Sequence, residues 1–289
     1  MKRIAKKNRA YPISVWMTVM MALVYIFLYA PLIIMVVFSF NKGSGTTVFE
    51  GFSVKWYGEL FSGRGSSGEY LSALRNSLLL AVLSAVISTF LGTLAALGIY
   101  RLRSKRLSEA FLGINNIPMM NPDIVTGVSM MMLFVFVGTL IGSTADKVNF
   151  WTLLIAHITF SLPYVILNVM PKLSQMDPDL TEAALDLGCT PTQAFFKVVL
   201  HEIMPGILSG ALMAFTMSLD DFVISYFVTG SGFVTLPVEI YSYTKKPIQP
   251  KVYALFTLIF VAILLLMVTM NLLQARDSSK KLRRKGGNK

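Results

Sequence analysis

Several separate apolar runs, each long enough to cross a lipid bilayer, constrain this chain more than any other feature of its sequence. A transmembrane helix needs about 20 consecutive apolar residues. Runs of roughly this length lie at about 13–40, 71–100, 111–138, 151–171, 203–229 and 252–274. None shows the alternation of apolar and polar residues that a transmembrane β-barrel requires. Because only helices and closed barrels satisfy every backbone hydrogen bond in lipid, the sequence predicts an all-α polytopic membrane protein with about six transmembrane helices.

The composition supports a membrane protein rather than a protein that binds nucleic acid. Of the 289 residues, 54% are apolar and 14% are charged, whereas roughly 25% are charged in an ordinary soluble domain. The net charge of +11 would suit a nucleic-acid partner. The positive residues, however, lie at the two ends of the chain and in short segments beside the apolar runs, as the positive-inside rule describes. We therefore expect a lipid bilayer and no nucleic acid as partner.

The distribution of lysine and arginine predicts that both termini lie in the cytoplasm. Most of the 26 lysines and arginines fall in the two tails, in the segment 101–106, and at Lys172 and Lys197. An even number of spans puts all these places on one side, which the positive-inside rule assigns to the cytoplasm. The first apolar run exceeds the core of a signal peptide, so we expect a retained first helix. The predicted domains are a cytoplasmic tail (1–12), a six-helix transmembrane domain (13–274) and a basic cytoplasmic tail (275–289).

One segment on the predicted cytoplasmic side, at about 174–202, is polar and rich in helix-forming residues, and we expect one or two short helices there. In order along the chain it carries Glu182, Ala183, Ala184, Gly188, Val198, Leu200 and His201. This order resembles the EAA loop of ABC-importer permeases, whose pattern is EAA, three residues, Gly, nine residues, Ile, one residue and Leu-Pro. Val198 is a mild variant of the isoleucine, and His201 departs from the proline.

The resemblance to ABC-importer permeases implies the type I importer fold and a coupling role for this loop. In that family the loop forms a helix that docks in a groove of a separate ATPase subunit. The small side chains of Ala183 and Ala184 allow close packing, and Gly188 permits a sharp turn after the helix. Glu182 can accept hydrogen bonds or an ion pair from the partner. The same residues alone would also suit an ordinary amphipathic surface helix.

Motifs in three of the predicted spans are similar to the permeases of spermidine/putrescine importers of the PotC type. They are Pro122-Asp123-Ile124-Val125, the segment from His157 to Pro163, Ser218-Leu219-Asp220-Asp221-Phe222 and Phe227-Val228-Thr229-Gly230. The likeness runs from about Pro31 to Asp277. It implies inward transport of polyamines across the cell membrane by alternating access. It also implies a second, distinct permease chain, two ATPase subunits that use ATP, and an external solute-binding protein.

Nothing in the sequence points to chemistry within the chain itself. No Gly-x-x-x-x-Gly-Lys-[Ser/Thr] phosphate loop is present, so we expect the chain to bind no ATP, to hold no cofactor and not to be an enzyme. His157 and His201 lack companions at metal-ligand spacing, so we expect no metal site. We expect His157 to make a structural hydrogen bond within the helix bundle and His201 to lie in a loop.

Three alternatives stay open from the residues alone. The chain could be an ABC permease for another small solute. It could be a secondary transporter driven by an ion gradient, although inverted repeats and interrupted helices, which are common in such folds, are not visible in the sequence. It could be a membrane-embedded enzyme, but no catalytic constellation is visible. Uptake by a secondary transporter would survive ATP depletion in a clamped ion gradient.

Carboxylates inside the predicted spans are the candidate pathway residues. Each costs about 2.5–3.5 kcal/mol on insertion scales, so such residues mark functional sites. Asp220 and Asp221 are predicted well inside the fifth span; we expect one to face the pathway and the other to hold a partner helix, because neighbours on a helix point about 100° apart. Asp123 is predicted nearer the cytoplasmic exit, where a first-turn helix charge is its alternative role. Phe222 and Tyr226, one turn apart, would add cation–π attraction.

Overall fold

The computed structural model describes residues 15–43, 45, 48–62, 66–142, 148–177, 179–230, 232–244, 252–262, 264–265 and 268–269. These residues form helices and connections, with one isolated β-bridge between Asn41 and Phe52. The chain divides into two compact units. Residues Met1–Arg64 and Ile248–Lys289 form the first, and residues Gly65–Pro247 form the second.

The first unit contains α1 (Val15–Ser39), α2 (Lys55–Phe61) and an apolar helix at Val252–Ala262. The connection between α1 and α2 is folded around Asn41. Its side-chain amide donates to the carbonyl of Val48 at 2.8 Å, and its backbone carbonyl accepts the indole N–H of Trp56 at 2.6 Å. These bonds satisfy polar groups where the chain turns from the first helix into the second.

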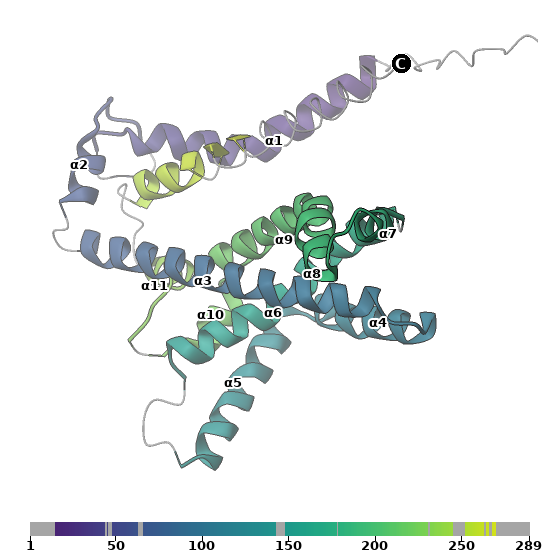
Figure 1. The fold of residues 1–289 in the computed structure, drawn as a ribbon. Helices are drawn as coiled ribbons and strands as arrows, with labels where there is room; N and C mark the ends of the chain where they lie inside the picture. The colour runs from purple at the N-terminus through teal and green to yellow at the C-terminus, as the bar shows by residue number, and fades with distance from the viewer. Residues whose placement is uncertain are drawn as a thin grey trace, which may run out of the picture. The chain divides into compact units, whose positions relative to one another are not determined.

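The second unit contains the remaining helices. They are α3 (Ser66–Tyr100), α4 (Lys105–Met120), α5 (Asp123–Leu140), α6 (Phe150–Gln175), α7 (Asp179–Asp186), α8 (Pro191–Ala194), a π-helical turn (Phe195–Val199), α9 (Leu200–Asp220), α10 (Val223–Val228) and α11 (Leu236–Thr244). Figure 1 shows α3, α6 and α9 lying together, with α5 directed away from them beside α10. Their arrangement places the segments that the sequence singles out at two ends of one packed bundle.

Among the described residues, five helical stretches are long and apolar enough to cross a membrane. They are Trp16–Ser39, Gly68–Tyr100, Asp123–Leu140, Phe150–Gln175 and Pro191–Asp220. The predicted sixth span, 252–274, begins as the apolar helix Val252–Ala262, and much of the rest of it lies outside the described residues. The prediction of an all-α, multi-pass membrane fold is confirmed.

Two of the predicted spans are wrong as continuous helices. In the third, α4 ends at Met120 and α5 begins at Asp123. Asn121 between them is extended (φ −82°, ψ 138°), as a residue before proline prefers to be. In the fifth, α9 ends at Asp220, and Asp221 is extended (φ −62°, ψ 121°) before α10 begins. The prediction that interrupted helices are absent is therefore wrong, and it no longer separates this chain from secondary transporters.

Small residues allow α3, α6 and α9 to approach one another closely. A Cβ atom added at Gly92 of α3 would lie 2.7 Å from Val165 Cγ1, and one added at Gly210 of α9 would lie 3.2 Å from Val165 Cα. Val165 of α6 is fully buried between them. Packing of this kind holds membrane helices together because lipid tails provide no hydrophobic driving force for their association.

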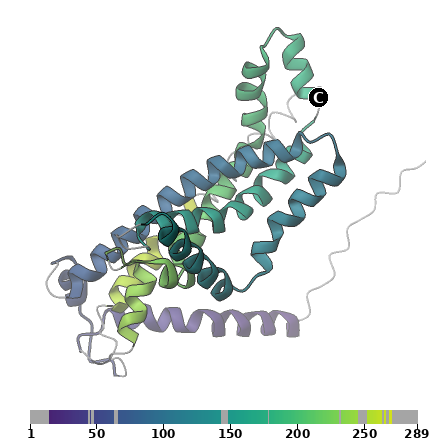
Figure 2. The same ribbon diagram turned by 90° about the horizontal axis from the view of Figure 1, so that it is seen from below.

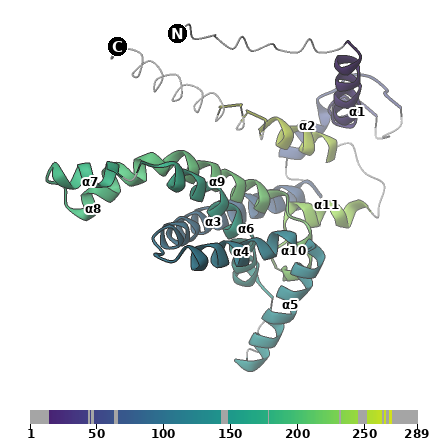
Figure 3. The same ribbon diagram turned by 90° about the vertical axis from the view of Figure 1, so that its right-hand side faces the viewer.

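α9 joins the two ends of the bundle. The hairpin of α7 and α8 leads into its N-terminal end and projects beyond the packed helices, as the green helices in Figure 2 show. α10 follows its C-terminal end, near α5 and α11 (Figure 3). Its 21 residues make α9 about 32 Å long at 1.5 Å per residue. α9 therefore separates the α7–α8 hairpin, which carries the EAA-like segment, from the Asp220-Asp221 pair by about the thickness of the hydrocarbon core of a membrane.

We predict opposite effects of alanine at two helical glycines. A Cβ at Gly206 of α9 would lie 2.9 Å from the backbone oxygen of Asn168 on α6, so Gly206→Ala should force the two helices apart. A Cβ at Gly98 of α3 would meet nothing within 4 Å. Gly98→Ala should be neutral or stabilising, because alanine favours a helix interior by about 1 kcal/mol over glycine.

Thermal melting of the purified protein measures both changes. We expect Gly206→Ala to lower the melting temperature and Gly98→Ala to leave it unchanged or raise it. Equal melting temperatures for the two variants would contradict the close α6–α9 contact.

Candidate functional site

The break between α9 and α10 holds the two adjacent aspartates in different surroundings. Asp221 lies in the break itself, and its side chain is 7% exposed. Its Oδ2 accepts the backbone N–H of Ser225 at 2.8 Å, and its Oδ1 accepts that of Ile224 at 3.3 Å. These are N–H groups that the first turn of a helix leaves without a partner inside the helix. Asp221 therefore caps α10.

His157 of α6 lies directly behind this cap. Its side chain is buried, and its Nε2 atom is 3.6 Å from Oδ2 of Asp221. Nδ1 is 2.7 Å from the hydroxyl of Ser218 on α9, and Nε2 is 3.1 Å from the hydroxyl of Ser225 on α10. The predicted structural hydrogen bond of His157 is confirmed. The prediction that His201 lies in a loop is wrong, because it is in the first turn of α9.

Asp220 differs from its neighbour in being exposed. It is the last residue of α9, so it lies at the C-terminal end of that helix, beside the last backbone carbonyls. The last four carbonyls of a helix have no partner within it and carry the negative end of the helix dipole. The predicted position of the pair inside a continuous helix is wrong, but the expected division between the two residues agrees with their surroundings. That either of them faces the transport pathway stays a prediction.

Three aromatic rings meet beside the break. The ring centroids of Phe222 and Tyr226 are 5.4 Å apart, as expected for residues one turn apart. Tyr241 of α11 lies against both, at 4.8 Å from Phe222 and 5.7 Å from Tyr226. Tyr226 is 46% exposed, so this aromatic corner is accessible from one side. Tyr241 could not be predicted from the sequence, because it belongs to a short helix between two apolar runs and is part of no motif.

Asp123 is the first residue of α5 and is exposed. One turn later, a Cβ at Gly127 would lie 3.1 Å from the ring of Phe227 and 3.4 Å from the carbonyl of Val223, so α5 and α10 touch there. Asp123 is consequently within electrostatic range of Asp221. That Asp123 lies nearer the cytoplasmic exit than the pair stays a prediction. The contact at Gly127 brings the first turn of α5 against α10.

The EAA-like segment folds into the expected short helices. Glu182 and Ala183 are exposed on α7, whereas Ala184 is buried. Gly188 ends the turn with φ +84°, and its N–H donates to the carbonyl of Leu185 at 2.9 Å. The N–H of Cys189 donates back to Ala184 at 3.1 Å, which completes a Schellman motif. The Glu-Ala-Ala part of the pattern thus lies on a helix, and the glycine of the pattern ends that helix with a left-handed backbone conformation, which glycine adopts more readily than other residues.

α8 begins with a reciprocal cap. The hydroxyl of Thr190 accepts the backbone N–H of Gln193 at 3.3 Å, and the Gln193 side chain accepts the backbone N–H of Thr190 at 3.1 Å. Pro191 occupies the first helical position, where its missing N–H costs nothing. Local hydrogen bonds thus shape both parts of the hairpin, whose exposed side includes Glu182 and Ala183.

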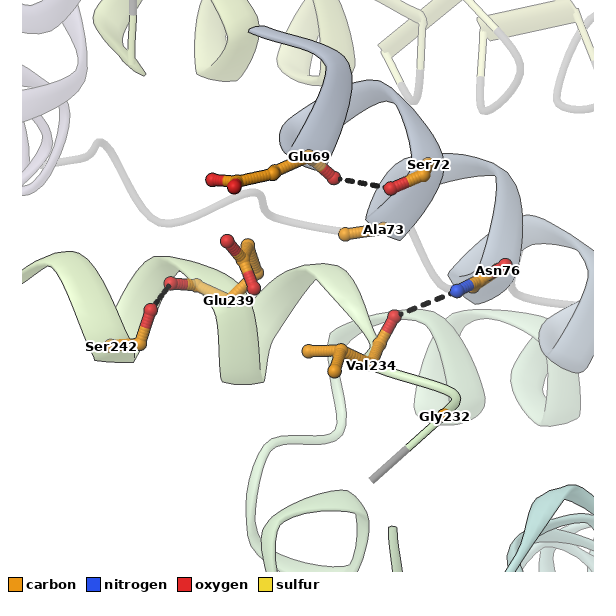
Figure 4. A pocket seen from close by; sticks show the side chains of 8 residues that line it. All are labelled: Glu69, Ser72, Ala73, Asn76, Gly232, Val234, Glu239 and Ser242. Atoms are coloured by element: carbon orange, nitrogen blue, oxygen red, sulfur yellow. Dashed lines mark hydrogen bonds between the residues drawn. The ribbon is translucent and has the colours of Figure 1, made fainter. Parts of the chain in front are cut away.

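A polar pocket lies between the first turns of α3 and the connection into α11 (Figure 4). It has a volume of about 440 Å³, and the carboxylates of Glu69 and Glu239 project into it. Asn76 donates to the carbonyl of Val234 at 3.1 Å and fixes its floor. Burial, and then the neighbouring Glu69 carboxylate, raise the pKa of Glu239 above its usual value. Among the described residues no group of three or more His, Cys, Asp or Glu is placed to hold a metal ion.

Residues 88–279 match the protein family described as the binding-protein-dependent transport system inner membrane component. The chain belongs to this family. It is 39% identical over 270 residues to PotI, the putrescine transport system permease protein of Escherichia coli K12, covering 93% of this chain and 94% of PotI. It is 38% identical over 261 residues to PotC, the spermidine/putrescine transport system permease protein of the same strain, covering 90% of this chain and 94% of PotC.

The fold has a solved counterpart. A chain in the crystal structure of a bacterial ABC transporter involved in the import of the acidic polysaccharide alginate aligns with a TM-score of 0.63 and 13% identity, over 95% of this chain and 99% of that one. At this identity the likeness shows the fold alone. The predicted resemblance to ABC-importer permeases and the multi-pass location in the inner membrane are confirmed.

The pocket predicts a pH-dependent effect of one substitution. A carboxyl whose pKa is raised by folding binds its proton more tightly when folded, so its ionisation destabilises the fold as pH rises above the usual value of 4.5. Glu239→Gln removes this cost and should raise the melting temperature at pH 7. The gain should disappear as the pH falls below 4.5.

The control is Glu109→Gln on α4. Glu109 is exposed and faces Lys105 at 4.0 Å, so its loss should leave the melting temperature unchanged or slightly lower. A lower melting temperature for Glu239→Gln at pH 7 would show that the Glu239 carboxylate is stabilised rather than repelled in the pocket.

Proposed function

We propose that this chain is the permease subunit of an ATP-driven importer that carries polyamines such as putrescine and spermidine into the cell. The observation that carries the proposal is the likeness to two polyamine permeases over nine-tenths of the chain or more. The chain moves its cargo by alternating access and without chemical change. It binds no ATP; ATP binding and hydrolysis take place on two separate ATPase subunits. A second, distinct permease chain completes the pathway, and an external binding protein delivers the solute.

The break after α9 has the chemistry that a cationic amine requires. A polyamine that enters a low-dielectric path loses hydration, and fixed negative charge offsets that loss. Asp220 supplies a full negative charge, and the carbonyls that end α9 supply the negative end of a helix dipole. Broken helices of other transporters bind cations at such ends. We assign Asp220 to the pathway and treat Asp123 as the weaker candidate.

The aromatic corner complements the charge. Phe222, Tyr226 and Tyr241 present ring faces within 5.7 Å of one another. A ring face attracts an ammonium group within about 6 Å of its centroid, and the same face packs against methylene groups. A polyamine alternates these two kinds of group along its length. The three rings therefore suit such a cargo better than a compact anion.

The α7–α8 hairpin is proposed as the docking element for the ATPase. Glu182 and Ala183 are exposed, and Leu187 is 86% exposed beside Gly188. An exposed leucine next to small and acidic side chains fits a groove in a protein partner. Docking to an ATPase places the hairpin on the cytoplasmic side of the membrane, and both termini are proposed to lie on that side as well. Because α9 runs from the hairpin to the break, displacement of the hairpin acts directly on the end of α9 that bears Asp220.

The alternative of an ion-gradient-driven transporter is distinguished by energy dependence. Uptake that persists after ATP depletion in a clamped ion gradient would favour that alternative. An ABC permease for another solute is distinguished by competition, in which spermidine, putrescine, amino acids and oxyanions are compared as inhibitors of uptake.

The first prediction for this function concerns Asp220. Asp220→Asn keeps the shape and removes the charge, so uptake of putrescine by the complete importer should fall about 10- to 100-fold, the usual effect of losing one charged hydrogen-bonding partner. Hydrolysis of ATP should remain measurable. Asp220→Glu retains the charge and should recover most of the uptake. Normal uptake by Asp220→Asn would remove Asp220 from the pathway.

The second prediction concerns coupling. A Cβ at Gly188 meets nothing within 4 Å, so Gly188→Val acts only through backbone strain at φ +84°. It should distort the hairpin and reduce uptake and ATP hydrolysis together, whereas Gly188→Asn should be tolerated, since asparagine adopts left-handed conformations. Glu182→Ala should weaken the ATPase contact and also reduce uptake.

The matched control is Gly142→Val at the end of α5. Gly142 has φ +69° and equally open surroundings, so it imposes the same kind of strain away from the hairpin. Membrane insertion should be normal in all variants. If Gly188→Val and Gly142→Val transport equally well, the hairpin is not the coupling element.

A further inference from the structure

Four helices meet at one buried chain of polar side chains. It consists of Ser84 on α3, Ser218 on α9, His157 on α6, Ser225 on α10 and Asp221 in the break. The three serines and His157 are at most 3% exposed. Buried polar groups without partners are costly, and the cost is highest where neither water nor lipid can supply a hydrogen bond. The arrangement of donors and acceptors in this chain is therefore strongly constrained.

The protons of the chain can be placed by counting donors. The Ser84 hydroxyl donates to Ser218 Oγ at 2.9 Å. Ser218 still has its own proton to donate, and Nδ1 of His157 lies 2.7 Å from its Oγ. When Ser218 donates to Nδ1, the imidazole proton lies on Nε2. Nε2–H then donates to Ser225 Oγ, and the Ser225 hydroxyl donates to the Asp221 carboxylate. Every donor points the same way, and the series ends on a negative charge.

The reverse direction fails at its last step. If Ser84 donated instead to the carbonyl of Ala81, 3.2 Å away, Nδ1 could carry the imidazole proton. The bare lone pair of His157 Nε2 would then face Oδ2 of Asp221 at 3.6 Å. Ser225 would donate to the imidazole and no longer to the carboxylate. The carboxylate of Asp221 thus favours a proton on Nε2 of His157.

We propose that His157 is a positioning residue for the substrate pathway. Through Ser225 and Asp221 it holds the cap of α10, and through Ser218 and Ser84 it ties that cap to α9 and α3. α10 has six residues, too few to be stable as an isolated helix. The placement of Phe222 and Tyr226 beside Asp220 therefore depends on the cap. This inference rests on the proposed function of the break, since the residues that it positions are those proposed to meet the polyamine.

The first experiment measures putrescine transported per ATP hydrolysed by the complete importer in proteoliposomes with its binding protein. His157→Leu keeps an apolar side chain of moderate size but removes both ring nitrogens. We expect the ratio to fall about tenfold, because a misplaced pathway residue loses cargo contacts while ATPase turnover continues. A defect that is only structural would lower transport and hydrolysis together and leave the ratio unchanged, and that result would overturn the proposal.

His157→Gln is the conservative variant. Its amide nitrogen can take the place of Nε2–H and donate to Ser225, so it should recover most of the ratio that His157→Leu loses. Failure of glutamine to do better than leucine would contradict the role of the Nε2 proton.

Two serines of α3 form a matched pair for the far end of the chain. Ser84 and Ser88 are both fully buried one turn apart. Ser84 bonds to Ser218 across the helices, whereas the bond recorded for Ser88 goes to Ala85 of its own helix at 3.3 Å. Ser84→Ala should lower the transport ratio, and Ser88→Ala should not. Equal effects of the two substitutions would overturn the proposal.

A thermal double-mutant cycle separates this inference from the proposed function. If His157 holds Asp221, the losses of melting temperature in His157→Leu and Asp221→Asn should not add in the double variant, because each breaks the same series of bonds. Additive losses would overturn the positioning role. Non-additive losses together with normal uptake by Asp220→Asn would support the positioning role and refute the pathway role of the break.

Discussion

A membrane interior offers no hydrogen bonds, so every interruption of a helix must be satisfied by the protein itself. The structure meets this constraint at Asp221, whose carboxylate accepts two N–H groups at the start of α10. At the other interruption, before α5, the carbonyl of Pro122 accepts the N–H groups of Val125 and Thr126 at 2.9 and 3.2 Å. The cap of α10 is a side chain, which can rotate away from the N–H groups that it accepts, whereas the backbone carbonyl of Pro122 is fixed by the chain. The α9–α10 interruption therefore depends on distant residues, and the candidate site is built on it.

Close packing joins the break after α9 to the bundle of α3, α6 and α9. Val165 fills the space left by Gly92 and Gly210, so α3, α6 and α9 contact one another along their backbones. Such a bundle transmits displacement along α9 instead of absorbing it, because close-packed interiors are nearly incompressible. At one end of α9, a Schellman turn and a capping box shape the hairpin. At the other end the break is held by four helices.

The sequence predicts the elements that follow local rules and misses those that depend on distant contacts. Apolar runs predict the fold class, and the helix-then-glycine pattern predicts α7 and Gly188. The first interruption could have been read from Asn121-Pro122, since proline disfavours a helical residue before it. The second contains neither proline nor glycine. Besides the local cap by Asp221, contacts with His157, which is 64 positions away from Asp221, and with α3 hold this interruption. Tyr241 was missed for the same reason, because its helix contributes to the site only through tertiary packing.

Two adjacent carboxylates at a membrane site are costly, and their surroundings explain why both can be present. The charge of Asp221 is neutralised at short range by backbone N–H groups and the Ser225 hydroxyl, so little of it is available to a solute. Asp220 is exposed. Asp123 is within electrostatic range of Asp221 at the same break. Under the proposed function, one ammonium group of the cargo compensates the exposed charge of Asp220, and a second ammonium group of the same molecule can compensate Asp123. A monovalent cation can compensate one of these carboxylates, whereas a polyamine can compensate both.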